Sequence, residues 1–145
     1  MIEVPKPWGL ERWVVHTDKY AGKFLYINKG ESMSKQYHKE KHETIFLLGG
    51  KIKVEIGEEN SPIYKCIIVD ASVSDKDKVF IIPPNTVHRI EAITGSVLIE
   101  WSTGELDDVV RIEDKYGRSN NGSGSGKKTT TTNRRKTKST NKSAK

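Results

Sequence analysis

Short runs of β-branched and aliphatic residues recur along most of the chain, and each run ends at glycine, proline or asparagine after a few residues. No stretch shows a convincing helical repeat of apolar residues. Strands of this length with turns at regular spacing are typical of a sheet that closes on itself or packs against a second sheet. The sequence therefore predicts an all-β domain with its strands in a double-sheet barrel.

The predicted strands cover residues 10–16, 23–28, 34–38, 43–48, 51–56, 63–69, 79–82, 86–92 and 96–102, with a last candidate at 109–112. Gly49-Gly50 predicts a hairpin between two of these strands, and Thr94-Gly95 predicts a second hairpin. The apolar run at 79–82 favours a strand that is buried on both faces. Cys66 is the single cysteine, so an internal disulfide is excluded, and its alternating position predicts a buried strand residue.

Residues 119–145 contain no aromatic residue and no aliphatic residue larger than alanine, so they cannot offset the entropy lost on ordering. We expect a disordered basic tail there and one folded domain over residues 1–118. Eight of the 25 Lys and Arg lie in this tail, which leaves 17 against 19 Asp and Glu in the domain. The tail could contact nucleic acid by releasing counterions from phosphates, although it has no aromatic residue to stack on bases.

The N-terminus carries no apolar run of the kind that directs secretion, and no stretch is apolar over the length needed to cross a membrane. We therefore expect a cytoplasmic protein without membrane contact.

The stretch from residue 30 to residue 50 carries the clearest chemistry. Gln36 and His38 share one face of a predicted strand, and Glu43 begins the next strand. Alternate residues of a strand point to the same side, so two facing strands would direct these three side chains to one interior point. An imidazole, a carboxylate and an amide oxygen at one point predict a metal pocket.

Other interpretations of the same residues are possible. His38 and His42 are four residues apart and could form a helical zinc pair, but the β-branched and apolar run that follows favours a strand. We expect His42 to be a solvated loop residue and residues 39–41 to form an exposed charged turn. The histidines could also line the barrel without holding any metal.

Two motifs resemble those of the cupin superfamily. The first is Gly30, Gln36-x-His38, Glu43 and Gly50, with Gln36 where a histidine is usual, and the second is the run at 80–89 with Pro83 and His88. The resemblance implies a double-stranded β-helix, the cupin jelly-roll barrel. It also implies a set of four ligands for a divalent metal ion, which are Gln36, His38, Glu43 and His88. Such a set suits zinc best, with manganese, iron, cobalt or nickel as alternatives.

The remainder of the chain resembles one branch of this superfamily more closely. Pro7-Trp8-Gly9 near the start and the run at 100–118 look like type II mannose-6-phosphate isomerases, and the resemblance covers residues 4–118. In many bacteria such a domain is the C-terminal part of a bifunctional enzyme that also has mannose-1-phosphate guanylyltransferase activity. The nucleotidyltransferase part is not matched here, so guanylyl transfer is not implied.

The resemblance implies a metal-dependent aldose–ketose isomerase that acts on a sugar phosphate such as mannose 6-phosphate through an enediolate. Lys41 and Arg111 are the candidates for moving the proton, and Arg89, Arg111 and Lys23 are the candidates for binding the phosphate. Lys41 stands where the family usually has arginine, which leaves the choice of substrate open.

The rival interpretation is a non-catalytic cupin module that binds a sugar or a nucleotide sugar. An iron-dependent dioxygenase is disfavoured, since such enzymes usually have two histidines in the first motif and this chain has Gln36. For either of the first two functions we expect a homodimer, because cupins commonly pair through edge strands.

Overall fold

The computed structural model describes residues 1–58, 61, 64–72 and 75–120. Over these residues all the regular elements are β-strands, apart from the short 3-10 helix η1 (Asp75–Lys78). The expected all-β fold is confirmed. Among the described residues, no helix has both the length and the apolar composition required to cross a membrane.

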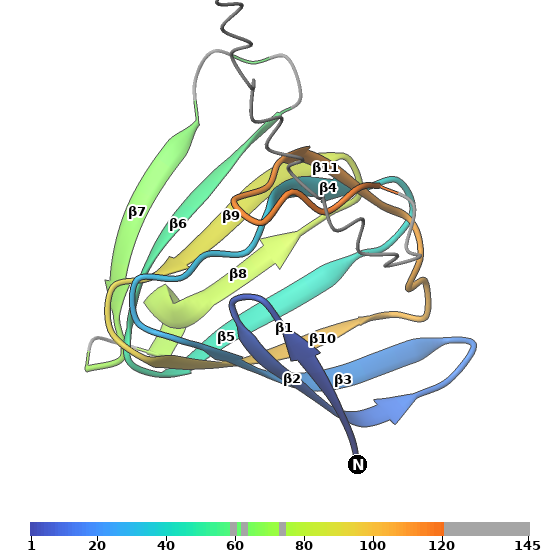
Figure 1. Ribbon diagram of the computed structural model, residues 1–145, viewed down its shortest axis with the longest axis horizontal. Coiled ribbons are helices and arrows are strands. Elements are labelled where there is room, and N and C mark those ends of the chain that lie inside the picture. The colour runs from blue at the N-terminus through green and yellow to red at the C-terminus, as the bar shows by residue number, and fades with distance from the viewer. Residues whose placement is uncertain (59–60, 62–63, 73–74, 121–145) are drawn as a thin grey trace, which may run out of the picture.

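The strands form two antiparallel sheets that face each other (Figure 1). The six-stranded sheet has the order β1 (Ile2–Lys6), β2 (Gly9–His16), β3 (Tyr20–Ile27), β10 (Ser96–Thr103), β5 (Glu43–Gly49) and β8 (Val79–Ile82). The five-stranded sheet has the order β11 (Val109–Glu113), β4 (Lys35–His38), β9 (Thr86–Ala92), β6 (Lys51–Glu58) and β7 (Lys65–Asp70). Strand β1, which contains Pro5, was not among the predicted strands.

Both predicted hairpins are wrong. Strands β5 and β6 belong to different sheets, and so do β9 and β10, so each glycine-containing link carries the chain from one sheet to the other. The two links lie side by side, with the amide of Ile93 donating to the carbonyl of Lys51 at 2.8 Å. Gly50 has φ +90°, and a Cβ there would lie 2.5 Å from the carbonyl oxygen of Gly95. Glycine suits such a crossing as well as it suits a hairpin, so the local sequence could not distinguish them.

Inward-facing side chains of both sheets form one hydrophobic core. Its buried members are Trp8, Leu25, Ile27, Ile45, Leu47, Ile52, Val54, Val69, Phe80, Ile82, Ile90, Ala92 and Leu98. Strand β8 contributes only one face to this core. Val79 and Ile81 on its other face are 42% and 63% exposed, so the prediction of a strand buried on both faces is wrong. β8 is an edge strand of its sheet, and the described part of the chain leaves its outward side chains uncovered.

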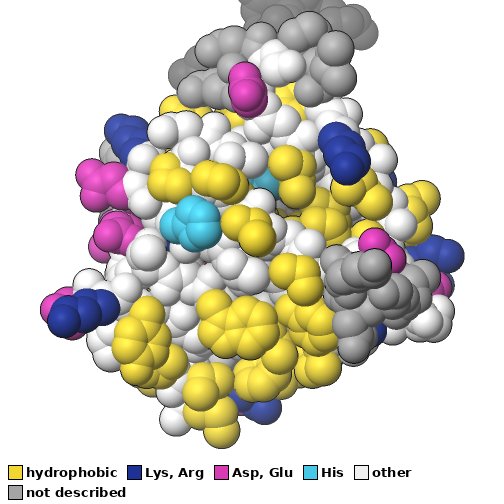
Figure 2. Space-filling model, turned by 180° about the vertical axis from the view of Figure 1, so that it is seen from behind, with side chains coloured by type: hydrophobic (Ala, Val, Ile, Leu, Met, Phe, Trp, Pro, Cys, Tyr) yellow, Lys and Arg dark blue, Asp and Glu magenta, His cyan; other side chains and the backbone are white. Residues whose placement is uncertain are grey.

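The outside of the six-stranded sheet is apolar over four of its strands, β3, β10, β5 and β8. Every outward-facing side chain of these four strands is uncharged. Trp101 and Leu48 are among the exposed residues of this face. Figure 2 shows that hydrophobic side chains gather over much of one side of the molecule. On the other sheet, Cys66 of edge strand β7 is exposed, contrary to the prediction that it is buried.

Two residues past the boundary expected at residue 118 are described, and they contact the end of the domain. After β11 the chain turns back, and Arg118 donates hydrogen bonds to Asp114 from both its backbone amide and its guanidinium group. Ser119 and Asn120 both accept hydrogen bonds from Arg111. The remaining part of the predicted tail, residues 121–145, lies outside the described residues.

Candidate metal centre

A cavity with a volume of about 1380 Å³ is lined by side chains from both sheets and from the segments that flank β11. Most of the residues predicted to form the site line it, namely Lys23, Gln36, His38, Lys41, Glu43 and Arg111. The two segments around β11 also contribute, through Leu106 and Asp107 before the strand and through Tyr116 to Asn120 after it. The cavity is therefore closed on one side by the C-terminal part of the described chain.

Three of the four predicted metal ligands come together, and two of them, His38 and Glu43, line this cavity. His38 ends β4, Glu43 begins β5, and His88 lies on β9, which pairs with β4. Their ligand atoms all lie within 4.8 Å of one another. The Nε2 atom of His38 is 2.9 Å from Oε1 of Glu43, and the Nε2 atom of His88 is 3.7 Å from Oε2. All three residues are buried.

The second ring nitrogen of each histidine already has a partner. Nδ1 of His38 lies 2.7 Å from Oδ1 of Asp108, and Nδ1 of His88 lies 3.0 Å from the carbonyl oxygen of Thr86. Both Nε2 atoms are buried and face the Glu43 carboxylate, and neither has a hydrogen bond of good geometry among the described residues. A buried nitrogen that lacks a partner is costly, and an imidazole with its proton on Nδ1 offers Nε2 as a metal ligand. The donor set therefore fits a divalent metal ion.

The electrostatics of the cluster agree with this donor set. Burial opposes ionisation of Glu43, but the contact with His38 and the charge of Lys41 outweigh it and hold the pKa of Glu43 well below its ordinary value of 4.5. Burial lowers the pKa of His88 below 6.5, although the charge of Glu43 acts in the opposite direction. Glu43 is thus a carboxylate near pH 7, and His88 is a neutral imidazole.

The fourth predicted ligand, Gln36, points into the same cavity. It pairs with His88 across β4 and β9, and its Oε1 atom accepts a hydrogen bond from the Ser34 hydroxyl at 2.5 Å. The same oxygen has a second lone pair, so the Ser34 contact leaves it able to bind an ion. Its assignment as a ligand stays a prediction.

A chain of alternating charges runs from this cluster into the barrel. The Lys41 ammonium contacts Glu43 and lies 2.8 Å from Glu100, and Lys23 lies 3.2 Å from the same oxygen of Glu100. Lys41 is only 4% exposed, so the prediction that it belongs to an exposed turn is wrong. Burial opposes its charge, but Glu100 and Glu43 more than compensate and raise the pKa of Lys41 above 10.5.

Sequence reasoning gave Glu100 no role in the site. A signal was nevertheless present, because an acidic residue interrupts the apolar run of β10 on the same face as Leu98, which is fully buried. Charged residues at inward positions of a strand are rare unless they are paired. The predicted phosphate ligand Lys23 is its cross-strand partner on β3.

Arg111 differs from the other cations that line this cavity, because it has no carboxylate partner among the described residues. Its guanidinium group donates to the carbonyl oxygen of Ser119 at 2.8 Å, while its Nε atom is buried without a partner. None of the described carboxylates forms an ion pair with it, whereas the neighbouring Arg118 pairs with Asp114 at 2.6 Å. Burial and the charge of Arg118 both lower the pKa of Arg111.

Arg89 does not reach the cavity, which corrects its expected role in phosphate binding. It follows His88 on β9, and because successive side chains of a strand point to opposite faces, Arg89 points outward. On that face it binds Glu55 at 3.0 Å and Glu113 at 3.1 Å.

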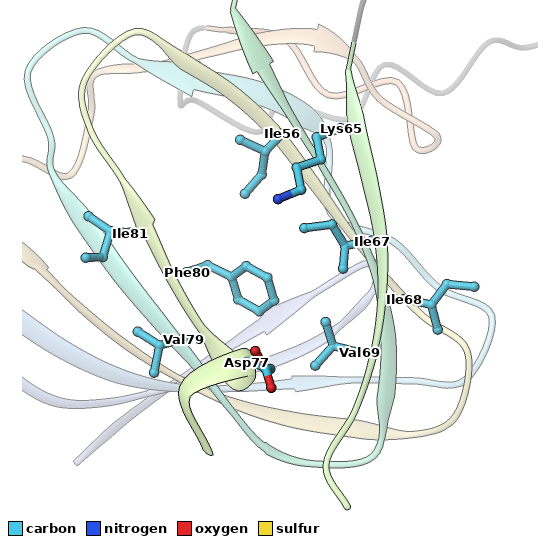
Figure 3. Close-up of a pocket in the computed structure, with 9 residues that line it drawn as sticks. All are labelled: Ile56, Lys65, Ile67, Ile68, Val69, Asp77, Val79, Phe80 and Ile81. Carbon is cyan, nitrogen blue, oxygen red and sulfur yellow. The ribbon is translucent and has the colours of Figure 1, made fainter. Parts of the chain in front are cut away.

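A second cavity, of about 640 Å³, lies between the edge strands β7 and β8 (Figure 3). Its walls are mainly isoleucine, valine and phenylalanine side chains, with Lys65 and Asp77 as the charged residues. None of the predicted site residues lines it. The predicted site residues that line a cavity therefore all line the larger one.

The fold and the buried histidine–glutamate cluster define the molecule as a cupin. Among solved structures, capsular polysaccharide assembling protein CapF from Staphylococcus aureus is similar, with a TM-score of 0.68 and 20% identity over 78% of this chain and 34% of that chain. KdgF from Halomonas sp. is also similar, with a TM-score of 0.59 and 17% identity over 74% of this chain and 90% of that chain. At these identities the likeness shows the fold.

Sequence similarity identifies the family to which the chain belongs. The family described as mannose-6-phosphate isomerase C-terminal matches residues 1–114, and the chain belongs to this family. Mannose-1-phosphate guanylyltransferase RfbM of Salmonella typhimurium is 30% identical over 120 residues, which are 79% of this chain and 23% of that protein. A mannose-1-phosphate guanylyltransferase of Escherichia coli is 32% identical over 122 residues, which are 80% of this chain and 23% of that protein. The chain thus spans about a quarter of the length of these relatives.

Proposed function

We propose that this chain is a divalent-metal-dependent isomerase that interconverts an aldose phosphate and a ketose phosphate, with mannose 6-phosphate as the model substrate. The observation that carries the proposal is the buried cluster of His38, Glu43 and His88, in which both Nε2 atoms face the Glu43 carboxylate without a hydrogen bond of good geometry among the described residues. The cluster adjoins a cavity large enough for a hexose phosphate. The description of the matching family supports the same activity.

The reaction transfers a proton between C2 and C1 of the sugar. His38, Glu43 and His88 would hold the ion, with the amide oxygen of Gln36 as the proposed fourth ligand. We propose zinc as the ion, with manganese, iron, cobalt or nickel as alternatives. When bound, the ion would polarise the substrate carbonyl and stabilise the negative charge of the enediolate.

The other charged groups of the cavity have separate roles in this proposal. Arg111 binds the phosphate, because among the described residues it is the cation of the cavity without a carboxylate partner and its planar fork suits phosphate oxygens. Lys41 lies beside Glu43, where it can hold a sugar hydroxyl or the migrating proton. Lys23 is already paired with Glu100, which places it in a supporting position rather than in direct contact with phosphate.

The proposal does not extend to guanylyl transfer. That activity is named for relatives of which this chain matches about a quarter, and the family that matches the chain is described as the isomerase C-terminal part.

A non-catalytic sugar-binding module is the second candidate, and one observation favours it. The Lys41 ammonium contacts Oε1 of Glu43, the same oxygen that faces His38, so an internal cation already neutralises the central carboxylate. A barrel balanced in this way needs no added ion to neutralise its central carboxylate.

The two candidates are separated by one experiment. The protein is reconstituted with zinc, and separately with manganese, and is then incubated with mannose 6-phosphate and other hexose and pentose phosphates. The isomerase predicts ketose formation that EDTA abolishes, that added metal restores, and that the variant His88→Ala lacks. His42→Ala is the matched control, because His42 is exposed and is not part of the cluster. Stoichiometric metal without turnover of any sugar phosphate would favour the binding module, and failure to bind metal would remove the isomerase.

A further inference from the structure

Asp108 contacts two separate parts of the candidate metal centre at once. It lies immediately before β11, in the segment that connects this strand to β10, and the next residue, Val109, pairs with His38 across β11 and β4. One carboxylate oxygen, Oδ1, is 2.7 Å from Nδ1 of His38. The other, Oδ2, accepts the backbone amides of Glu40 and Lys41 at 2.9 Å and 2.8 Å.

We propose that Asp108 is a positioning residue of the metal centre, which holds the proton of His38 on Nδ1 and fixes the turn that carries Lys41. This inference rests on the proposed function in one respect, namely that His38 is a metal ligand. A carboxylate can only accept a hydrogen bond near neutral pH, so the contact with Asp108 requires a proton on Nδ1 of His38. Nε2 is the atom that faces Glu43.

The two histidines of the centre are oriented in different ways. His88 is held by the carbonyl of Thr86, two residues before it on the same strand, so its orientation is built into β9. The partner of His38 comes from a position 70 residues further along the chain. The orientation of His38, unlike that of His88, therefore depends on the segment before β11 closing over the cavity.

The isosteric change Asp108→Asn tests this role sharply. An asparagine has one acceptor oxygen, so it can satisfy either the two backbone amides or His38, and its NH₂ group must face the other. If the oxygen keeps the two amides, the NH₂ group faces Nδ1 of His38 and drives the proton to Nε2, where it blocks metal binding. If the oxygen keeps His38, the NH₂ group faces the amides of the turn, and Lys41 is displaced.

Metal affinity is the first readout. Zinc affinity is measured by competition with a chromophoric chelator, and cobalt is used to record the visible absorption spectrum of the centre. Asp108→Asn should weaken zinc binding by about 10- to 100-fold and alter the cobalt spectrum. Glu55→Gln is the matched control, since it makes the same chemical change at a carboxylate that binds Arg89 on the outer face. Unchanged affinity and spectrum in Asp108→Asn would overturn the proposal.

The second readout needs neither metal nor activity. Two-bond proton–nitrogen NMR correlations of the metal-free protein report which ring nitrogen of His38 carries the proton. We expect a proton on Nδ1 in the wild type, and an unprotonated Nδ1 in the wild type would overturn the proposal even if the variant failed to fold. If the wild type bound no metal, the proposed isomerase would fall, while a proton on Nδ1 that shifts in Asp108→Asn would still support the positioning role.

Discussion

Lys23 and Glu100 face each other on neighbouring strands β3 and β10, and their charged groups lie 3.2 Å apart inside the barrel. Both side chains are buried, and the oxygen of Glu100 that contacts Lys23 also contacts the ammonium group of Lys41. A buried ion pair adds little net stability compared with apolar residues, but removing one partner leaves a charge without compensation. The pair is therefore a point at which single substitutions are costly.

We expect Glu100→Gln to lower the free energy of unfolding by about 3 kcal/mol, because two buried lysines then share a neutral partner. The double variant Lys23→Met with Glu100→Gln should recover part of this loss, since it removes the cation together with its anion. Urea unfolding of the wild type, both single variants and the double variant measures the coupling. Additive losses would show that the two charges do not interact.

Metal binding should stabilise the fold through the His38–Glu43–His88 cluster. At a free zinc concentration about 100 times the Kd, binding adds about 2.7 kcal/mol to the free energy of unfolding, which raises Tm by several degrees. His38→Ala and His88→Ala should abolish this rise, and EDTA should reverse it. The exposed His42 provides the control, and a rise that survives in His88→Ala would place the ion elsewhere.

Substitution of Arg111 and substitution of Arg89 should have different effects on KM for a sugar phosphate. Arg111→Met removes the cation of the cavity that has no carboxylate partner, so KM for a sugar phosphate should increase about tenfold. Arg89→Met removes a cation that binds Glu55 and Glu113 on the outer face, and KM should stay the same even if stability falls. Steady-state kinetics compare the two, and an effect of equal size in both would contradict the assigned phosphate site.

Asp114 should make stability depend on acid pH. Burial opposes its charge, but the hydrogen bonds from Arg118 outweigh this and lower the pKa of Asp114 below its ordinary value of 3.8. The ionised form is thus favoured by folding, and its contribution is complete above the unfolded pKa and is lost as the pH falls through the folded pKa.

Asp114→Asn should accordingly lower the free energy of unfolding by about 1 kcal/mol near neutral pH. The difference from the wild type should shrink as the pH falls below about 4. Urea titrations at a series of pH values measure it, and a difference that does not change with pH would rule out the ion pair as its cause.

The sequence predicts the strands of this fold well, because alternation and turn residues act over a few positions. It could not assign strands to sheets, since the glycine links after β5 and β9 do not determine whether the chain reverses within a sheet or crosses to the other one. Arg89 is a different case. Its outward position follows from alternation with His88, so the sequence already held the information that excludes it from the cavity.

Within the site, the four proposed metal ligands could be chosen from their spacing and from the resemblance to a family. The burial of Lys41 could not, because it depends on Glu100, which lies 59 residues away. The contact of Asp108 with His38 was missed for the same reason. The homodimer and the contact of the basic tail with nucleic acid stay predictions.

The contact between the Lys41 ammonium and Glu43 means that the barrel supplies its own counterion at the centre. Under the proposed function, binding of an external ion would be an exchange, in which the ammonium leaves Glu43 and keeps its contact with Glu100. A preparation stripped of metal during purification would keep this internal balance of charge. Its spectra and its elution volume would give no warning that the centre was empty.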